Sequence, residues 1–312
     1  MRAQRGVALI TAVMVVAFAS TVAAALMVSQ NLAVHRSANM IHQDQAWWYL
    51  VGMEQWAGTL LDRDLEDNQF DYLGEAWAQP VDFLPVDEGA LSGRLVDLQG
   101  RFNLLSVVSG DGVVVEPRKQ QLIRLLQNVE GLKSGTAEEL AIAIVDWMDQ
   151  DTEPGFPSGA EDSLYLSKDR PYRAPNRPMA SVSELLLVNG VTPKIYAALQ
   201  PHVTVHPGDH KINVNTATAP VLMSLNENMN PGVVEGLMNK REEVPWETDE
   251  QFITDELIAG ISMTTEDITV KTHYFQAEAA AMIGNVRLSY VSLLERLEGA
   301  RTRPIAHSRN TL

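Results

Sequence analysis

The stretch that decides the fold is Arg5-Gly6-Val7-Ala8-Leu9-Ile10-Thr11, with the uncharged run that continues from Val7 to Val28. About 20 apolar residues in a helix cross the hydrocarbon core of a bilayer. Arginines at positions 2 and 5 precede the run, and this bias keeps the short leading end in the cytoplasm. No Pro or Gly interrupts residues 7–51. The sequence therefore predicts a membrane helix over residues 7–29 that continues into an amphipathic helix.

Two kinds of leader fit this N-terminus. The first is a secretory signal peptide, with the small residues Ala23-Ala24-Ala25 near a cut. The second is a short basic leader, residues 1–6, that is cut after Gly6 so that Val7 becomes the first mature residue. The long apolar run and the unbroken helix favour the second. In this form the N-terminus resembles the type IV pilin and pseudopilin family, whose members usually carry Glu at the fifth mature residue. Thr11 stands there instead.

Composition points to an acidic envelope protein. The 312 residues carry a formal net charge of −16, which disfavours binding to nucleic-acid phosphates and favours cations or basic protein surfaces. The chain has no cysteine, so disulfide and thiol chemistry are excluded. The length allows one large or two modest domains beyond the anchor.

The first helix is expected to run to about Leu65. Glu54 falls inside its apolar face and Trp48 falls outside it. The predicted apolar face consists of Trp47, Leu50, Val51, Met53, Trp56, Ala57, Leu60, Leu61 and Leu65.

The pattern after this helix indicates an α+β, pilin-like fold: a long N-terminal helix plus an antiparallel sheet. Residues 67–88 read as a loop, and residues 91–105 as two short strands with a turn at Gln99-Gly100. Alternation returns over residues 270–291 with a turn at Ile283-Gly284-Asn285. We assign residues 30–109 and 271–298 to the pilin-like domain and expect a disordered tail over residues 299–312.

A large, mostly helical insert is predicted between these two parts, over residues 110–270. Ser181 with Glu184 forms a capping box, Gly190 marks a helix end and Pro193 a new start. Expected helices cover residues 117–130, 136–147, 181–189, 216–225 and 231–241.

An acidic loop over residues 146–165 is the densest polar feature. Asp149, Asp151 and Glu153 alternate at the end of a helix, a spacing that lets oxygens converge on one hard cation. Glu161 and Asp162 follow and could return to the same ion. A solvated acidic loop and catalytic carboxylates are the alternatives, although no partner His, Lys or Ser arrangement lies nearby. We predict calcium ligands at Asp149, Asp151, Glu161 and Asp162.

Residues 211–241 resemble a helix-hairpin-helix or SAM-like unit, and residues 185–199 look like a shorter copy. Such units bind DNA through backbone N–H groups and basic flanks. Here the second turn is surrounded by glutamates, and Lys240-Arg241 is the only local basic pair. We therefore expect no nucleic-acid binding.

Taken together, the motifs resemble the K-type minor pseudopilin family of type II secretion systems. This resemblance implies a pilin-type α+β domain interrupted by a large helical domain, bound calcium and no catalytic activity. The motifs that carry it are Arg5 to Thr11, Gln45-Ala46-Trp47, Gly100-Arg101-Phe102-Asn103, Asp146-Trp147-Met148-Asp149, Gly159-Ala160-Glu161-Asp162, Tyr172-Arg173-Ala174-Pro175-Asn176, Ser183-Glu184-Leu185 and Asn213-Val214-Asn215-Thr216-Ala217.

The same resemblance implies partners and a location. It implies a single pass through the bacterial inner membrane, a globular part in the periplasm and a leader removed by prepilin peptidase. It also implies a place at the pseudopilus tip with the I-type and J-type minor pseudopilins and the major pseudopilin. A Glu at position 11, buried in lipid, would pair with the N-terminal amine of the subunit above it. A subunit at the tip has no subunit above it and so needs no such carboxylate. Thr11 fits that position.

Two other functions stay open on the sequence alone. The chain could be a secreted or periplasmic calcium-binding protein with a cleaved signal peptide. It could also be an envelope DNA-uptake protein built on the helix-hairpin-helix copies.

Overall fold

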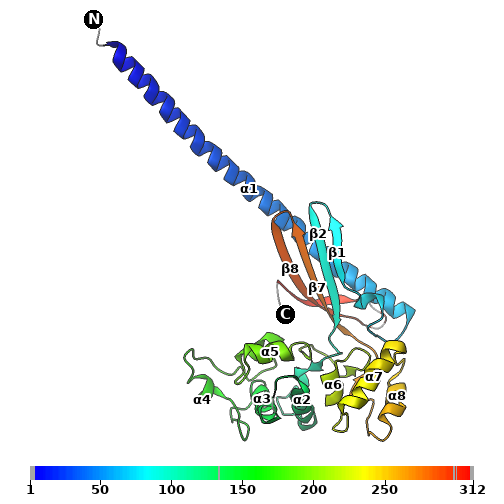
Figure 1. Cartoon of the computed structure of the whole chain (residues 1–312). Coiled ribbons are helices and arrows are strands. Elements are labelled where there is room, and N and C mark those ends of the chain that lie inside the picture. Colours follow the sequence, from blue (N-terminus) through cyan, green and yellow to red (C-terminus); the bar gives the residue numbers. More distant parts are fainter. Residues whose placement is uncertain (1–3, 133, 298, 300, 310–312) are drawn as a thin grey trace.

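The computed structural model describes residues 4–132, 134–297, 299 and 301–309 (Figure 1). Its first element is one helix of 64 residues, α1, Gln4–Asp67. The N-terminal half of α1 projects away from the rest of the molecule, and its apolar window is wholly exposed. It is long and apolar enough to span a membrane. The predicted continuous helix is confirmed over the described residues.

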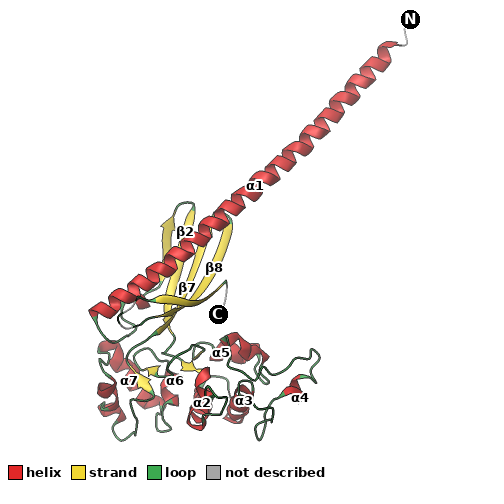
Figure 2. Ribbon diagram, turned by 180° about the vertical axis from the view of Figure 1, so that it is seen from behind, coloured by secondary structure: helices red, strands yellow, loops and turns green. Residues whose placement is uncertain are grey.

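The C-terminal half of α1 packs across an antiparallel sheet (Figure 2). The strand order is β1-β2-β7-β8-β9, so the chain leaves the sheet after β2 and returns to its centre at β7. The five strands are β1 Val81–Val86, β2 Gly89–Asp97, β7 Tyr274–Ile283, β8 Val286–Glu295 and β9 Arg303–Ser308.

Alternate residues of the sheet face α1, as the period of two requires. Leu61 of α1 and Phe275 of β7 are fully buried there, as is Trp77 from a short 3-10 helix, η1 Ala76–Ala78. The Trp77 and Phe275 rings meet edge-on, with their centroids 5.1 Å apart. Glu54, the polar residue within the apolar face of the helix, accepts a hydrogen bond from the Tyr290 hydroxyl at 2.9 Å. Trp56, predicted as part of that face, is 48% exposed at its margin.

The β7–β8 hairpin turns through Gly284-Asn285, as predicted, with Ile283 opposite Val286. Gly284 has φ +52°, and a Cβ on it would lie 2.5 Å from the His42 ring on α1. The turn therefore needs glycine both for its backbone conformation and for close approach to the helix.

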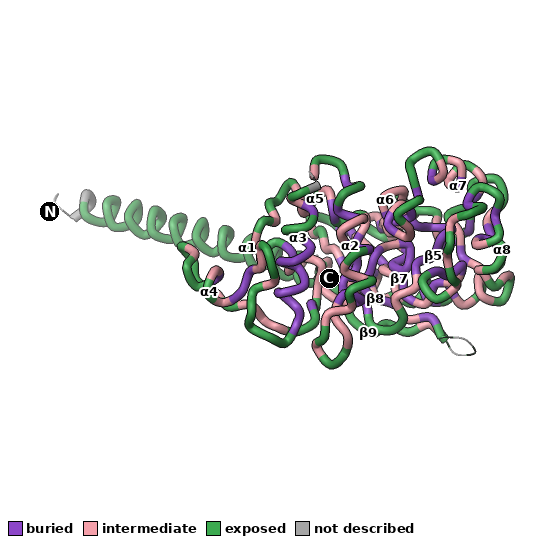
Figure 3. Tube along the Cα trace, turned by 90° about the horizontal axis from the view of Figure 1, so that it is seen from below, coloured by how far each residue is buried: buried purple, intermediate pink, exposed green. Residues whose placement is uncertain are grey.

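Between β2 and β7 the chain forms a helical unit with its own core, residues 102–270. Leu122, Leu140 and Leu237 are among its buried side chains. In the Cα tube of Figure 3, the buried residues, drawn purple, gather in the interior. The α-helices are α2 Glu116–Asn128, α3 Ser134–Asp146, α4 Asp162–Tyr165, α5 Pro193–Leu199, α6 Ala219–Ser224, α7 Pro231–Glu243 and α8 Asp249–Ile253.

Short elements complete the helical unit. Ser181 is the N-cap, as predicted, and accepts a hydrogen bond from the Ser183 N–H. The predicted capping box does not close, because Glu184 accepts from the Ala180 N–H at 2.7 Å instead of from Ser181, and the helix that follows is a 3-10 helix. The remaining elements are the 3-10 helices η2 Leu104–Val107, η3 Val182–Leu187 and η4 Glu256–Ile258, and the parallel pairs β3 Phe102–Asn103 with β4 Val203–Thr204, and β5 Ile212–Asn213 with β6 Ile268–Thr269.

The predicted hairpin at Gln99-Gly100 is wrong. Strand β2 pairs with β1 and β7, whereas β3 pairs with β4 in the helical unit. Residues 98–101 are thus a link between two cores. The loop predicted over residues 67–88 also contains β1, an exposed edge strand that includes Pro85, which a central strand would not tolerate.

The disordered tail predicted over residues 299–312 is contradicted where the structure describes it. Residues 303–308 form β9, which pairs with β8. The backbone N–H of Thr302 donates to Asp62 of α1 at 2.7 Å, and Arg303 pairs with Glu295 at 2.8 Å. Polar composition misled the prediction, because an edge strand gains its order from the ladder beside it.

Candidate metal centre and domain junction

The acidic loop begins where α3 ends, at Asp146. This carboxylate is buried, and its Oδ2 accepts hydrogen bonds from the backbone N–H groups of Gly155, at 3.0 Å, and Ala160, at 2.7 Å. The loop is therefore hydrogen-bonded at two points, Gly155 and Ala160, to one carboxylate oxygen at the end of α3. Asp146, read from sequence as a helix residue beside Trp147, acts as the organiser of the loop.

The loop closes so tightly that Gly159 has no room for a side chain. A Cβ at this position would lie 2.1 Å from the Gly155 nitrogen and 2.3 Å from Asp146 Oδ2. Backbone atoms cannot yield at such distances. Glycine at position 159 is therefore required for the loop to reach the carboxylate that organises it.

Three of the four predicted ligands come together. One oxygen each from Asp149, Asp151 and Glu161 lies within 4.8 Å of the other two. We call these residues the loop cluster. Asp149 and Glu161 are buried, whereas Asp151 is exposed. Asp149 Oδ1 and Glu161 Oε1 have no hydrogen-bond partner among the described residues. Buried acceptors are rarely left unpaired, because each costs its desolvation energy.

Electrostatics make the loop cluster unfavourable as it stands. Burial, together with Asp151, Asp146 and Glu161, raises the pKa of Asp149 to about 7. Burial likewise raises the pKa of Glu161. A divalent cation between these oxygens would reverse both shifts, because an opposite charge favours the ionised form. The donors are all oxygens, the set that calcium prefers.

Asn176 is a further candidate ligand that the sequence prediction missed. It adopts φ +44°, and its amide nitrogen donates to the Asp151 carbonyl and, at 3.5 Å, to Glu161 Oε2. Its Oδ1 is buried and has no hydrogen-bond partner in the part of the chain that the structure describes. The residue stood in a quoted motif, Tyr172 to Asn176, but nothing in that motif signals that Asn176 returns to the acidic loop.

Asp162, the fourth predicted ligand, does not join the loop cluster. It begins α4, and its Oδ1 accepts a hydrogen bond from the Ala174 N–H at 3.1 Å. Its Oδ2 pairs with Arg173 at 3.4 Å. Both oxygens are used to hold the segment that follows, so we withdraw Asp162 from the ligand set.

The residues of the predicted cleavage lie at the exposed end of α1. Gly6 and Val7 are helical, and the Thr11 hydroxyl donates within the same helix, to the carbonyls of Val7 and Ala8 at 3.1 and 3.0 Å. The polar group of Thr11 is therefore satisfied without a neighbouring chain.

The basic pair of the helix-hairpin-helix-like unit is engaged inside the chain. Lys240 pairs with Asp255 at 2.7 Å. Arg241 is buried and donates to the carbonyls of Val214 and Ala217 at 2.8 and 2.7 Å. The Lys240 ammonium and the Arg241 guanidinium, which would be needed to bind a phosphate, are therefore engaged within the chain.

A second polar centre joins the sheet to the helical unit. Asp97, at the end of β2, is buried, and its Oδ1 accepts hydrogen bonds from the N–H groups of residues 99 and 100. Its Oδ2 accepts from Asn213, Thr216 and Thr272. Burial raises the pKa of Asp97 to about 6, and the hydroxyl bonds oppose that shift. The motif Asn213 to Ala217 thus fixes one unit on the other.

Three more carboxylates surround Arg296 beside this centre. Arg296 is 3% exposed and donates to Asp64 at 3.0 Å and to Asp71 at 2.6 Å. The third, Glu75, accepts hydrogen bonds from Asn68 and Trp77, each at 2.7 Å. We call Asp64, Asp71 and Glu75 the junction cluster, since they link the end of α1 to the end of β8.

Comparison with known proteins places these features in one family. The family described as "Type II secretion system (T2SS), protein K" matches residues 100–208 and 212–271. The chain is 36% identical to type II secretion system protein K of Pseudomonas aeruginosa, over 98% of this chain and 92% of that protein. It is 31% identical to the protein of the same name from Pectobacterium carotovorum, over 97% and 95%.

A solved structure is also similar. It is the crystal structure of the GspK-GspI-GspJ complex from the enterotoxigenic Escherichia coli type 2 secretion system. The match has a TM-score of 0.77 at 25% identity and covers 89% of this chain and all of the matched chain.

Proposed function

Since this chain belongs to the type II secretion system protein K family of minor pseudopilins, we propose that it occupies the tip of the pseudopilus. There it would assemble with I-type and J-type minor pseudopilins, above the major pseudopilin. The similar solved chain is part of a GspK-GspI-GspJ complex, which supports these partners. We assign the chain an assembly role rather than a catalytic one.

The observation that carries the tip position is Thr11. Its hydroxyl is satisfied by carbonyls of its own helix, so the apolar segment presents no polar group that a subunit above must neutralise. The helical unit lies at the opposite end of the molecule from the anchor (Figure 1). A bulky unit at that end would obstruct the docking of another subunit on top.

Cysteine crosslinking tests this position, because the chain itself contains no cysteine. Thr11→Cys is combined with a cysteine at the first mature residue of each partner, and a crosslink between the two shows that the partner lies above this chain. Val7→Cys, paired with a cysteine at the fifth mature residue of each partner, reports a subunit below and serves as the matched control. We expect crosslinks from the second pair only. Efficient crosslinks from both pairs would make this chain an interior subunit.

We further propose that residues 1–6 are removed by prepilin peptidase, with the mature chain held in the inner membrane and its globular part in the periplasm. Gly6→Leu should block leader removal, because a peptidase that cuts after this position requires a small residue. Mass spectrometry of the mature N-terminus provides the measurement. A chain that starts at Val7 supports the proposal. A chain that starts near Leu26 would instead indicate a signal peptide and a released calcium-binding protein.

We also propose that the loop cluster, with Asn176, holds calcium. Two carboxylate oxygens and one amide oxygen that are buried without a hydrogen-bond partner among the described residues support this. Bound calcium would neutralise the carboxylates and keep the loop closed around Asp146. Elemental analysis of the full-length protein, purified in detergent without chelator, should find calcium. Protein free of calcium that also fails to bind added calcium would remove the site.

A further inference from the structure

A stretch of the helical unit without regular structure contacts the acidic loop. It runs from Asp169 to Ala180, between α4 and η3, and we call it the strap. Among the described residues, its backbone makes no hydrogen bond to another backbone group. Prolines at positions 171, 175 and 178 remove three of its donors. Long stretches without secondary structure are uncommon in a compact domain, so side chains or a ligand must order this one.

The beginning of the strap is anchored by an aromatic side chain. The Tyr172 ring packs on the ring of Tyr165, with the two centroids 5.2 Å apart. Its hydroxyl donates to the Leu187 carbonyl at 2.6 Å. This attachment joins the strap to the core of the helical unit and does not involve the acidic loop.

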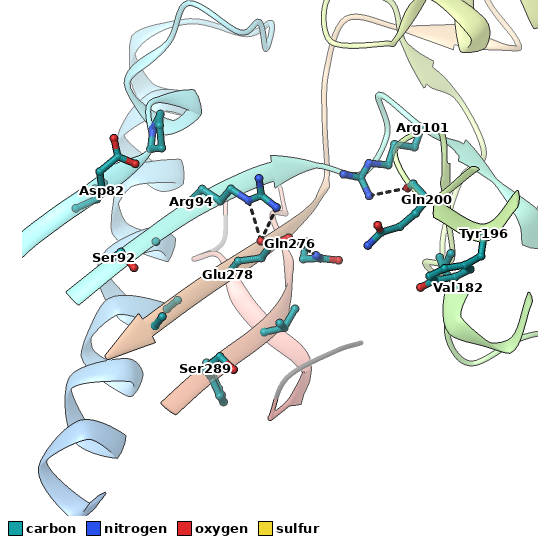
Figure 4. Close-up of a pocket in the computed structure, with 17 residues that line it drawn as sticks. Asp82, Ser92, Arg94, Arg101, Val182, Tyr196, Gln200, Gln276, Glu278 and Ser289 are labelled. Atoms are coloured by element: carbon teal, nitrogen blue, oxygen red, sulfur yellow. Dashed lines mark hydrogen bonds and ion pairs between the residues drawn. The ribbon is translucent and has the colours of Figure 1, made fainter. Parts of the chain in front are cut away.

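The end of the strap is anchored as well. Met179 is buried, and the N–H of the next residue donates to Glu184 at 2.7 Å. Val182, the first residue of η3, lines a cleft between the helical unit and the sheet together with Tyr196 of α5 (Figure 4). The element that follows the strap is therefore held by packing. Movement of the strap is confined to its middle, residues 173–178.

The middle of the strap has two attachments, and the first is weak. Asp162 accepts a hydrogen bond from the Ala174 N–H at 3.1 Å and pairs with Arg173 at 3.4 Å. The Arg173 side chain is 75% exposed, and exposed ion pairs contribute little to stability. A second attachment is needed to fix residues 173–178.

That second attachment is Asn176, whose side chain contacts the acidic loop. Its amide nitrogen donates to the Asp151 carbonyl and, at 3.5 Å, to Glu161 Oε2. Its backbone has φ +44°, in the left-handed region that Asn tolerates better than most residues. Such a conformation persists only where the surroundings hold it. The Oδ1 atom is buried and has no hydrogen-bond partner among the described residues, so it is available as a ligand.

The chain supplies no cation that holds the acidic loop to the strap. Asp149 and Glu161 are 4% and 2% exposed, and each has one oxygen without a hydrogen-bond partner among the described residues. Within the described chain, no arginine of the strap pairs with the loop cluster. Ionised carboxylates this close repel one another. Their separation would move Asp151 away from Glu161 and break the pair of contacts that Asn176 makes.

We propose that the loop cluster and Asn176 form a calcium-dependent link that holds the middle of the strap. This inference rests on the calcium site proposed above and gives that site a task, which is to set the order of the strap. Bound calcium would take oxygen ligands from both stretches of chain, which share no backbone–backbone hydrogen bond within the described residues. When calcium is removed, residues 173–178 become mobile, while Tyr172 and Met179 stay packed.

Spin labelling of the full-length protein in nanodiscs tests the proposal, since the chain has no cysteine of its own. A label on Arg177→Cys reports on the strap, because Arg177 is exposed and bonds only to the Pro178 carbonyl among the described residues. A label on Lys194→Cys, an exposed basic residue of α5, is the matched control. We expect chelator to shift the label at position 177 from the slow to the fast component of its EPR spectrum, and added calcium to reverse the shift. The label at position 194 should not change.

Two substitutions of Asn176 separate the ion from the hydrogen bonds. Asn176→Ala removes both attachments, so the label at position 177 should stay mobile even at saturating calcium. Asn176→Asp loses the amide donor but gains a carboxylate ligand, and Asp also tolerates the left-handed conformation. Its strap should be ordered with calcium and mobile in chelator. If the strap of Asn176→Asp were mobile under both conditions, the amide hydrogen bonds would be the attachment and the proposal would be overturned.

Calorimetry on the same samples distinguishes failure of this link from failure of the calcium site. If calcium binds the parent protein and the label at position 177 does not respond, the link is overturned and the site stands. If no calcium binds, both are overturned. A simultaneous change at position 194 also overturns the link, because the ion would then act on the folding of the whole helical unit.

Discussion

The loop cluster and the junction cluster each bring three carboxylates within 4.8 Å of one another, yet their surroundings are opposite. In the junction cluster, Arg296 donates to two carboxylates and the third accepts from Asn68 and Trp77. In the loop cluster, Asp149 Oδ1 and Glu161 Oε1 have no donor among the described residues. Proximity of carboxylates is therefore a poor indicator of a metal site. The supply of donors decides whether a group of acids needs an ion.

The difference has a physical reason. The junction cluster contains a cation that belongs to the chain, Arg296, which binds two of its three carboxylates, so its geometry is fixed when the chain folds. Among the described residues, no cation pairs with the loop cluster. Its donors are the Glu153 N–H, to Asp151 Oδ1, and the Asn176 amide, to Glu161 Oε2 at 3.5 Å, and neither carries a charge. In our calcium proposal, a bound ion supplies the missing charge. One cluster should respond to substitution of an arginine and the other to chelation.

Replacing the cation of the junction cluster should have the largest effect. Arg296→Met leaves Asp64 and Asp71 buried without their partner, and removing one member of a buried ion pair costs about 3–5 kcal/mol. Chemical denaturation of the full-length protein in detergent measures the loss. The matched control is Arg303→Met, which breaks the more exposed pair with Glu295 and should cost less than about 1 kcal/mol. Similar losses in both variants would mean that the junction cluster is not held by Arg296.

Removing calcium should have the next largest effect. A ligand present at about 100 times its Kd stabilises the folded state by about 2.7 kcal/mol, so excess chelator should lower the melting temperature of the parent protein. Asp149→Asn and Glu161→Gln should reduce that response.

The control for the calcium experiment comes from the same loop. Asp162→Asn should respond to chelator as the parent protein does, because its oxygens hold Ala174 and Arg173. Asn176→Ala should bind calcium more weakly than the parent protein. A melting temperature that does not change with chelator in the parent protein would contradict the metal assignment.

Adding a single methyl group to the acidic loop should have a smaller effect, which still distinguishes the loop cluster from the junction cluster. Gly159→Ala places a Cβ against the backbone of Gly155 and the carboxylate of Asp146, and overpacking of this kind costs about 1–3 kcal/mol. Titration calorimetry should show weaker calcium binding in this variant. Gly260→Ala is a control with open space around the Cβ, although its φ of +91° adds some strain. If the calcium affinity of Gly159→Ala were unchanged, ion binding would not depend on closure of the loop.

A pH dependence is also expected at the junction cluster. Burial, with Glu75 and Asp71, raises the pKa of Asp64 to about 7, while Arg296 opposes the shift. A folded-state pKa above the unfolded value gives stability that is complete below about pH 4 and is lost as pH rises through 7. Asp64→Asn lacks this titration. The parent protein should therefore lose stability relative to Asp64→Asn between pH 5 and pH 8. A difference between the two that is constant over this range would contradict the raised pKa.

Much of the fold could be predicted from local patterns. The apolar run after Arg5 predicts α1, and the turn at Gly284 predicts the β7–β8 hairpin, since each depends on neighbouring residues alone. The prediction of a hairpin at Gln99-Gly100 failed because the apolar residues before and after the turn belong to two different cores, that of the sheet and that of the helical unit. Strand β9 was missed because its order comes from pairing with β8.

The candidate metal site divides in the same way. The sequence by itself determined the acidic loop and three members of the loop cluster, because residues close together in the chain must stay close in space. Tertiary structure alone decided that Asn176 joins them and that Asp162 turns away to Ala174 and Arg173. It alone also brought Arg296 to Asp64 and Asp71, from which more than 200 residues separate it. Such pairings depend on the packing of whole elements, which local spacing does not encode.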